Sequence, residues 1–162
     1  MENIKLQDIF RLLASIVICQ SAGLIGSVFT MSAIPTWYTA LQKPFFTPPN
    51  WLFAPAWATL YLLMGISAFI IWRGGLSDKP AREALFIFGV QLVINVLWSV
   101  VFFGLKSPLS GLLVIVVLWV AILYTIYKFY RLSPAAALLL IPYILWVSFA
   151  AGLNVSIWVL NS

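Results

Sequence analysis

Five long apolar stretches, separated by short polar segments, dominate the hydrophobic pattern of this 162-residue chain. The charged residues lie between the stretches or at their ends. Each stretch therefore keeps about the 20 apolar residues that a helix needs to cross a hydrocarbon layer of ~30 Å. The pattern predicts an all-α integral membrane protein, a five-transmembrane-helix bundle, with spans at about 10–30, 51–72, 84–104, 109–129 and 135–160.

The composition indicates that the membrane bundle is the whole of residues 1–162. Hydrophobic residues make up 64% of the chain and charged residues 8%, which leaves no room for a water-soluble domain beside the bilayer. The connections near 73–83, 105–108 and 131–134 are short. Consecutive helices are therefore expected to be antiparallel neighbours within a single transmembrane domain.

The positive charges are divided unevenly between the two ends of the predicted bundle. Lys43 and Lys106 fall on the side opposite the N-terminus. Seven cations fall on the N-terminal side: Lys5, Arg11, Arg73, Lys79, Arg82, Lys128 and Arg131. By the positive-inside rule, we expect the N-terminus to be cytoplasmic.

The net charge of +5 could indicate nucleic-acid binding, but the cations lack interleaved aromatic residues. We interpret them as topology signals and lipid-headgroup contacts, with membrane lipid and not nucleic acid as the partner.

The connection after the first stretch is set apart by its length and its prolines. About 20 residues, 31–50, are predicted to lie on the outer face, and four of them are prolines: Pro35, Pro44, Pro48 and Pro49. A loop this long in so small a protein is usually functional. We predict a stiff aromatic lid over one end of the bundle, with a short interfacial helix at 37–41. The alternative is a plain aromatic belt, since Trp and Tyr favour the membrane interface.

Polar and large aromatic residues recur at helical spacing on one face of three predicted helices. In chain order, these faces are Trp57, Tyr61, Gly65 and Ala68; Gln91, Asn95, Trp98, Ser99 and Phe102; and Tyr143, Trp146, Ala150 and Asn154. Amide side chains are costly against lipid, so the faces should point inward. Together they predict the walls of a cavity inside the bundle.

Helix packing is the alternative explanation for the same faces. Amides and small residues hold ordinary membrane bundles together, because close backbone approach replaces the hydrophobic force that lipid removes. The small residues concerned are Gly23, Gly26, Gly65, Gly89, Ala150 and Gly152. For the three tryptophans of these faces, taken with Asn95, a pocket is favoured, because indole rings are too bulky for close packing and each N–H needs a partner.

A series of short motifs occurs in a fixed order from about Ser32 to Leu160. They are Trp37-Tyr38, Lys43-Pro44, Pro48-Pro49, Trp57 with Leu60-Tyr61 and Met64-Gly65, Asn95-x-x-Trp98-Ser99, Phe102-Phe103-Gly104, Pro142-Tyr143-x-x-Trp146 and Ala150-Ala151-Gly152-Leu153-Asn154. In order and spacing they resemble the TspO/translocator protein family, the tryptophan-rich sensory proteins also called the peripheral-type benzodiazepine receptor family.

The resemblance implies a five-helix bundle, often a homodimer, with a pocket beneath the first loop. That pocket would bind porphyrins such as protoporphyrin IX and synthetic aromatic ligands. Residues 153–162 lack the Tyr and the basic residue of the cholesterol motif found in vertebrate members. High-affinity sterol binding is therefore not expected. We expect a multi-pass protein of a microbial cell membrane.

The resemblance and the helical faces together define a predicted ligand-binding site. Its members are Tyr38, Trp57, Tyr61, Gln91, Asn95, Trp98, Phe102, Tyr143, Trp146, Ala150 and Asn154. No metal ligands are expected. No cofactor is required either, because porphyrin would be bound as a ligand. The chain has no histidine, so the commonest axial ligand of haem iron is missing and free-base porphyrin is the better candidate.

Three functions of different classes follow from this site. The first is a membrane receptor or carrier for porphyrins or related aromatic small molecules, with a sensory or stress-regulatory role. The second is an enzyme that degrades porphyrin with light and oxygen, in which the family resemblance implicates Trp57 and Trp146 as catalytic residues. The third, an ion-coupled exporter, is disfavoured because no predicted span contains a titratable carboxylate or histidine that would couple transport to protons.

Overall fold

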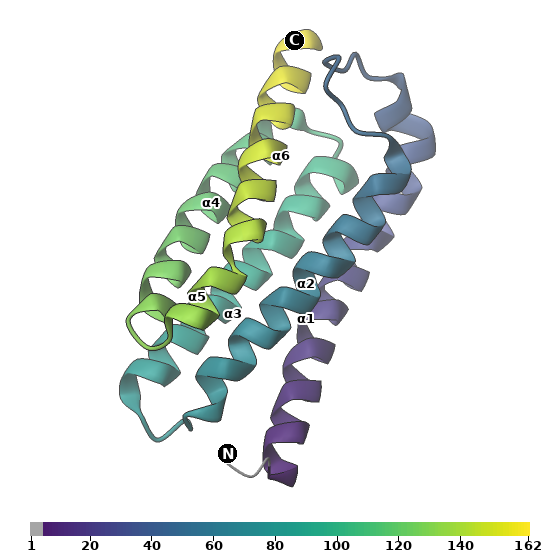
Figure 1. Ribbon diagram of the computed structural model, residues 1–162. Helices are drawn as coiled ribbons and strands as arrows, with labels where there is room; N and C mark the ends of the chain where they lie inside the picture. Colours follow the sequence, from purple (N-terminus) through teal and green to yellow (C-terminus); the bar gives the residue numbers. More distant parts are fainter. Residues whose placement is uncertain (1–4) are drawn as a thin grey trace.

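The computed structural model describes residues 5–162, and these residues form a bundle of long helices (Figure 1). The elements are α1 (Leu6–Ala33) continued by a π-helical turn (Ile34–Tyr38), α2 (Asn50–Arg73), α3 (Lys79–Ser99) continued by a second π-helical turn (Val100–Gly104), α4 (Pro108–Tyr130), α5 (Pro134–Leu139) and α6 (Ile141–Leu160). Five spans within these residues are long and apolar enough to cross a membrane. The five predicted spans are thus confirmed, and the fifth is divided into α5 and α6.

The starts of three helices follow directly from local sequence. Asp78, Ser107 and Ser133 occupy N-cap positions, and each side chain accepts a hydrogen bond from the backbone N–H three residues later. A proline lies in the first helical turn after each cap, where its missing N–H costs nothing. These caps set the ends of the short connections, so that the chain reverses direction at 74–78, 105–107 and 131–133.

The predicted first loop is wrong in its extent. Helical structure continues from α1 through the π-helical turn to residue 40, so only residues 41–49 lie outside helices. Residues 37–41 are accordingly not a separate interfacial helix. Pro35 is accommodated near the start of the π-helical turn, where the change of hydrogen-bonding pattern tolerates a residue without an N–H. That the remaining segment acts as a lid stays a prediction.

The 41–49 segment is hydrogen-bonded to the end of the first span and to the residue that follows α6. The Lys43 ammonium donates to the carbonyl oxygens of Tyr38, Thr39 and Leu41 at 2.8, 3.2 and 2.9 Å, near the end of the helix. Asn161, after α6, exchanges two hydrogen bonds with the backbone of Gln42 at 3.0 and 2.9 Å. This connection therefore has defined anchors at each side.

Close helix packing is centred on glycines of α1 and α2. A Cβ added at Gly65 would lie 2.8 Å from the Ile16 Cα, and one at Gly23 would lie 2.6 Å from the Tyr61 ring. The small residues therefore allow α1 and α2 to approach closely, as the packing explanation requires. Gly89 and Gly152 differ, because an added Cβ at either position would meet nothing within 4 Å.

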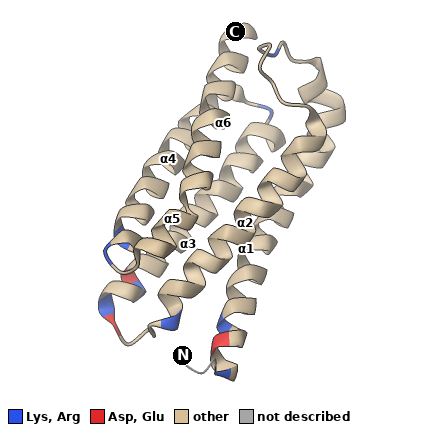
Figure 2. Cartoon of the chain, in the orientation of Figure 1, with Lys and Arg blue, Asp and Glu red and all other residues tan. Residues whose placement is uncertain are grey.

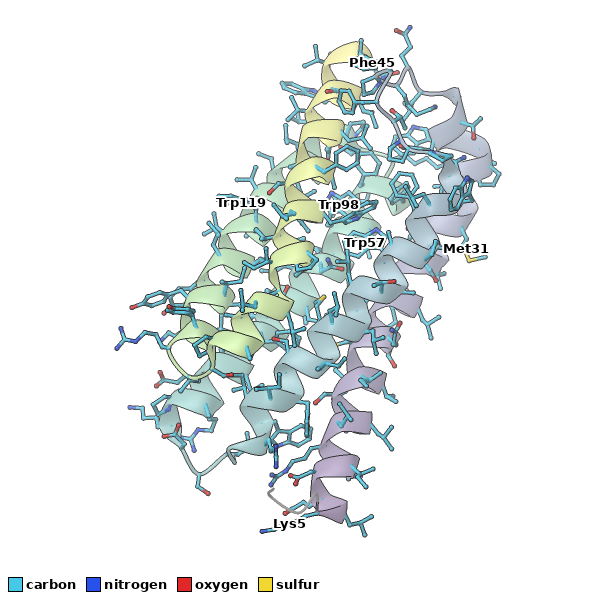
Figure 3. The ribbon with its side chains drawn as sticks, in the orientation of Figure 1. Lys5, Met31, Phe45, Trp57, Trp98 and Trp119 are labelled. Carbon is cyan, nitrogen blue, oxygen red and sulfur yellow. The ribbon has the colours of Figure 1, made fainter. Side chains whose placement is uncertain are left out.

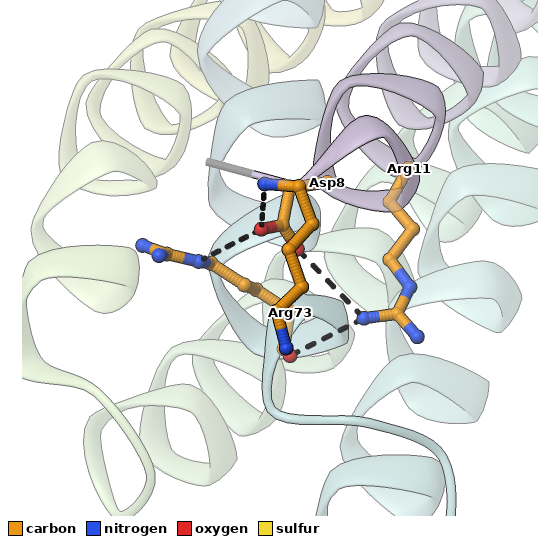
Figure 4. A network of polar contacts seen from close by, with 4 residues as sticks. Asp8, Arg11 and Arg73 are labelled. Carbon is orange, nitrogen blue, oxygen red and sulfur yellow. Dashed lines mark hydrogen bonds and ion pairs between the residues drawn. The ribbon is translucent and has the colours of Figure 1, made fainter. Parts of the chain in front are cut away.

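Charged residues gather at the two ends of the bundle, and most are at the end that carries the N-terminus (Figure 2). There, Asp8 of α1 lies 3.8 Å from the Arg73 Nε of α2 and 4.0 Å from Arg11 (Figure 4). Arg11 also donates to the backbone carbonyl of Arg73 at 3.4 Å. The cluster joins the ends of α1 and α2. The cytoplasmic position of this end stays a prediction.

Candidate functional site

A cavity of about 370 Å³ lies inside the bundle, on the side of its middle toward the C-terminal end. Its volume falls in the usual range for small-molecule sites. Trp57 and Trp98 lie together in the interior of the bundle (Figure 3). The wall comes from α1 and α3, each with the π-helical turn that continues it, and from α2 and α6. Eight predicted residues line it: Tyr38, Trp57, Tyr61, Trp98, Phe102, Trp146, Ala150 and Asn154.

Four aromatic rings form a continuous series along this wall. Tyr61 stacks on Trp57 with ring centroids 5.5 Å apart and planes at 29°. Trp57 and Trp98 follow at 6.4 Å and 35°, and Trp98 stacks on Phe102 at 5.5 Å and 24°. We call this series the aromatic ladder; its first and last pairs are stacked and its middle pair is tilted. Such an array suits a flat aromatic ligand.

Trp146 lines the cavity from α6 and contacts a ring of α2. Its ring contacts Phe53 at 6.2 Å and Phe149 at 5.8 Å, so two neighbouring rings restrict its orientation. One turn further along α6, Ala150 also lines the cavity and leaves space beside the indole. The arrangement places a large ring next to a small residue on one face, as the helical spacing predicted.

Asn154 provides a polar anchor at the end of the cavity. It accepts a hydrogen bond from the Trp98 indole N–H at 3.4 Å and donates from Nδ2 to the carbonyl oxygen of Pro108 at 2.7 Å. Gly111 makes this possible, since a Cβ there would lie 3.2 Å from Asn154 Oδ1. The indole N–H of Trp98 is thereby satisfied and its ring orientation is restricted.

Gln91, Asn95 and Tyr143 do not line the cavity, and form a buried polar network behind it. The Tyr61 hydroxyl donates to Asn95 Oδ1 at 2.5 Å, and Asn95 Nδ2 donates to the Tyr143 hydroxyl at 2.9 Å. The Tyr143 hydroxyl in turn donates to Gln91 Oε1 at 2.9 Å. All three side chains are only 1% exposed. They support Tyr61 from behind, and Tyr61 alone of this network reaches the cavity.

Tyr38 reaches the cavity from the π-helical turn that ends the first span. The ring is 2% exposed and contacts Phe103 at 5.8 Å and Phe102 at 6.5 Å. Its hydroxyl has no hydrogen-bond partner, a condition shared among the buried side chains of residues 5–162 only by Nε2 of Gln91. A buried hydroxyl without a partner is costly. The Tyr38 side chain lines the cavity, whereas its hydroxyl is itself buried.

The first span is a wall that the sequence analysis missed. Gln20, Gly23, Ser27, Thr30 and Ile34 are among the α1 and π-turn residues that line the cavity. A signal was present, because Gly23, Ser27 and Thr30 repeat at helical spacing on one face. That face lacks tryptophan and amide residues in its outer half, so it did not match the pattern used for the other three helices.

Part of the rim between α1 and α2 is exposed on the outside of the bundle. Leu24 and Met31 of α1 are 68% and 73% exposed and also line the cavity. Ala54 and Ala58 of α2 are exposed lining residues on the other side. Below them, Gln20 Nε2 donates to the carbonyl oxygen of Ala58 at 3.0 Å and joins the two helices. The cavity is therefore bordered here by small and flexible side chains.

Acid–base and metal chemistry have few candidate groups at this site. The lining residues include no carboxylate, lysine or arginine. Within residues 5–162, no group of three or more Cys, Asp or Glu side chains is placed to hold a metal ion. The wall is suited to binding by stacking and by a small number of neutral hydrogen bonds.

Comparison with known proteins gives consistent matches over the length of the chain. A sequence model described as the TspO/MBR family matches residues 15–159. The chain is 46% identical over 155 residues to a protein named tryptophan-rich protein TspO from Archaeoglobus fulgidus, covering 96% of this chain and 99% of that protein. It is 41% identical over 145 residues to protein CrtK of Rhodobacter capsulatus, covering 90% and 89%. It is 36% identical over 136 residues to the human translocator protein, covering 83% and 80%.

Proposed function

Because the chain belongs to the TspO/MBR family and is a multi-pass integral membrane protein, we propose that it is a membrane receptor or carrier for porphyrins and related flat aromatic molecules. Free-base protoporphyrin IX is the proposed ligand, and the cavity is the proposed site. The observation that carries the proposal is the aromatic ladder, four rings in contact along one wall of the cavity with successive planes at 29°, 35° and 24°.

Stacking is the main interaction expected for such a ligand. A tetrapyrrole macrocycle is flat and largely apolar, and aromatic contacts contribute about 0.5–1.5 kcal/mol beyond the burial of area. The Tyr38 hydroxyl is buried without a partner, so a small movement of its ring on binding would let it bond to a polar edge of the ligand. The exposed rim at Leu24 and Met31 allows a macrocycle larger than the enclosed space to extend between α1 and α2.

Titration of purified protein with protoporphyrin IX, followed by quenching of Trp fluorescence, tests this proposal. Trp146→Ala should weaken binding by roughly 1–3 kcal/mol, the loss expected for a large aromatic contact in a buried site. Trp119→Ala is the matched control. Trp119 lies on α4 away from the cavity and donates to Ser148 at 2.8 Å (Figure 3). Equal affinity in Trp146→Ala, Trp57→Ala and the control, with intact fold, would contradict the proposal.

Light-dependent porphyrin degradation is the second candidate function. It is favoured by one observation, that Trp57 and Trp146 line the same cavity and so would both contact one bound pigment. Oxygen would be the oxidant and the porphyrin the group oxidised. Chromatography of the products in light and in darkness distinguishes the two functions. If the protein is an enzyme, light should yield defined products that are absent in the double variant Trp57→Phe/Trp146→Phe. If it is a receptor, the porphyrin should bleach equally slowly with the variant and the wild type.

A further inference from the structure

A second hollow lies at the end of the bundle that carries the N-terminus, far along the helices from the porphyrin cavity. It is a surface groove of about 410 Å³ between the first three turns of α3 and the last two turns of α4. It shares no lining residue with the cavity. Six residues line this α3–α4 groove: Arg82, Glu83, Phe86, Ile87, Tyr124 and Lys128.

The polar end of the groove is positively charged. Lys128 Nζ lies 3.8 Å from one oxygen of Glu83, and Lys79 Nζ lies 3.9 Å from the other. Arg82 has no carboxylate within ion-pair distance among residues 5–162. The charged lining residues, Arg82, Lys128 and Glu83, thus carry a net charge of +1, and Lys79 beside Glu83 adds one more positive charge. The side chains are partly exposed, so these ion pairs are weak and can rearrange around an anion.

The other end of the groove is apolar and aromatic. Phe86 lies one turn beyond Arg82 on α3 and is 72% exposed. Tyr124 lies one turn before Lys128 on α4, is 49% exposed and stacks with Tyr127 at 6.4 Å. The Lys128 ammonium lies 5.6 Å from the centroid of the Tyr124 ring, so charge and aromatic surface meet directly. This change from cations to exposed rings falls where the charged ends of α3 and α4 give way to their apolar spans (Figure 2).

We propose that the α3–α4 groove binds one anionic glycerophospholipid. The lipid phosphate lies between Arg82 and Lys128, and the first carbons of an acyl chain lie on Phe86 and Tyr124. Arginine suits this role because its planar fork of donors matches phosphate oxygens. Glu83 disfavours a second anionic group beside the phosphate and accepts a hydrogen bond from a headgroup hydroxyl. Phosphatidylglycerol, with one phosphate and two hydroxyls in its headgroup, fits all of these contacts.

Native mass spectrometry tests the proposal with intact protein released from nanodiscs of equimolar phosphatidylglycerol and phosphatidylcholine. The wild type should retain a single phosphatidylglycerol in preference to phosphatidylcholine. In the double variant Arg82→Gln/Lys128→Gln, the fraction of protein that retains phosphatidylglycerol should fall about five-fold or more. A loss of about five-fold is the effect expected from removing one cation near a lipid surface, and the variant removes two. The matched control is Lys5→Gln/Arg131→Gln, which removes the same charge at the same end outside the groove. This control variant should retain phosphatidylglycerol to within roughly two-fold of the wild type.

Two further arms separate a lipid site from a phosphate site. Phe86→Ala should reduce phosphatidylglycerol retention, because the acyl chain loses its aromatic surface, and an excess of soluble glycerol phosphate should not displace the lipid. Equal retention of the two lipids by wild type overturns the proposal, as does undiminished retention in Arg82→Gln/Lys128→Gln. An equal loss in the control pair would assign the preference to general surface charge, and displacement by glycerol phosphate would assign it to phosphate alone.

Discussion

At the scale of single residues, Tyr38 has the clearest consequence, because its buried hydroxyl has no hydrogen-bond partner. The fold holds the ring between Phe102, Phe103 and the Lys43 ammonium, which lies 5.1 Å from the ring centroid. The hydroxyl adds no hydrogen bond to this packing. Its removal should therefore affect ligand binding and stability in different ways.

Tyr38→Phe should weaken binding of protoporphyrin IX by about 1 kcal/mol, roughly five-fold, if the hydroxyl bonds to the ligand as proposed. The thermal unfolding midpoint of the free protein should stay equal or rise slightly, since a buried unsatisfied group is lost. Fluorescence titration and thermal unfolding in one detergent measure both effects. Tyr130→Phe, at an exposed position outside the cavity, is the control. Unchanged affinity in Tyr38→Phe would show that the hydroxyl does not contact the ligand.

The polar residues show how far sequence reasoning reaches at this scale. Helical spacing correctly predicted that Asn95 and Trp98 face the interior, because amides and indoles avoid lipid. It did not predict that Asn95 is enclosed by Tyr61 and Tyr143 while Trp98 lines the cavity. The two residues share one face, and their difference depends on how far neighbouring helices are shifted along each other. One sequence contains no direct measure of that shift.

At the scale of elements, the spans and most helix starts could be predicted, whereas the end of the first span could not. Apolar length and the cap residues Asp78, Ser107 and Ser133 are local signals. Pro35 is also a local signal, and it lies within the predicted connection at 31–50. The chain instead passes through a π-helical turn and stays helical to residue 40, with Lys43 bonding to carbonyls at the end. The proline does not end the helix because the π-helical turn tolerates a residue without an N–H near its start.

The α1–α2 contact gives a prediction with a built-in comparison. Gly65→Ala should lower the free energy of unfolding by about 1–3 kcal/mol, because the new methyl would lie 2.8 Å from the Ile16 backbone. Gly89→Ala should leave stability unchanged or raise it by up to about 1 kcal/mol, since space is open there and alanine favours helix. Thermal and denaturant unfolding in detergent measure both variants. Equal effects of the two substitutions would contradict the close packing of α1 on α2.

At the scale of the whole molecule, the uneven charge predicts one orientation in the membrane. Cysteine labelling measures it, because Cys19 is buried and can be replaced by alanine as a background. A membrane-impermeant maleimide applied to right-side-out vesicles should label Phe45→Cys, at a fully exposed position between α1 and α2. It should not label Ser77→Cys, between α2 and α3, until the vesicles are opened. Labelling of Ser77→Cys alone in sealed vesicles would invert the predicted orientation.

The central claim, that a flat porphyrin occupies the cavity beside the aromatic ladder, is tested most directly by filling the cavity from α6. Ala150 lines the cavity, whereas Gly152 on the same helix has open space around it. In equilibrium titrations with protoporphyrin IX, Ala150→Phe should reduce affinity at least about ten-fold, a loss of ~1.4 kcal/mol or more, because the ring occupies the ligand's space. Gly152→Phe should bind like wild type. Wild-type affinity in a folded Ala150→Phe protein would contradict the claim.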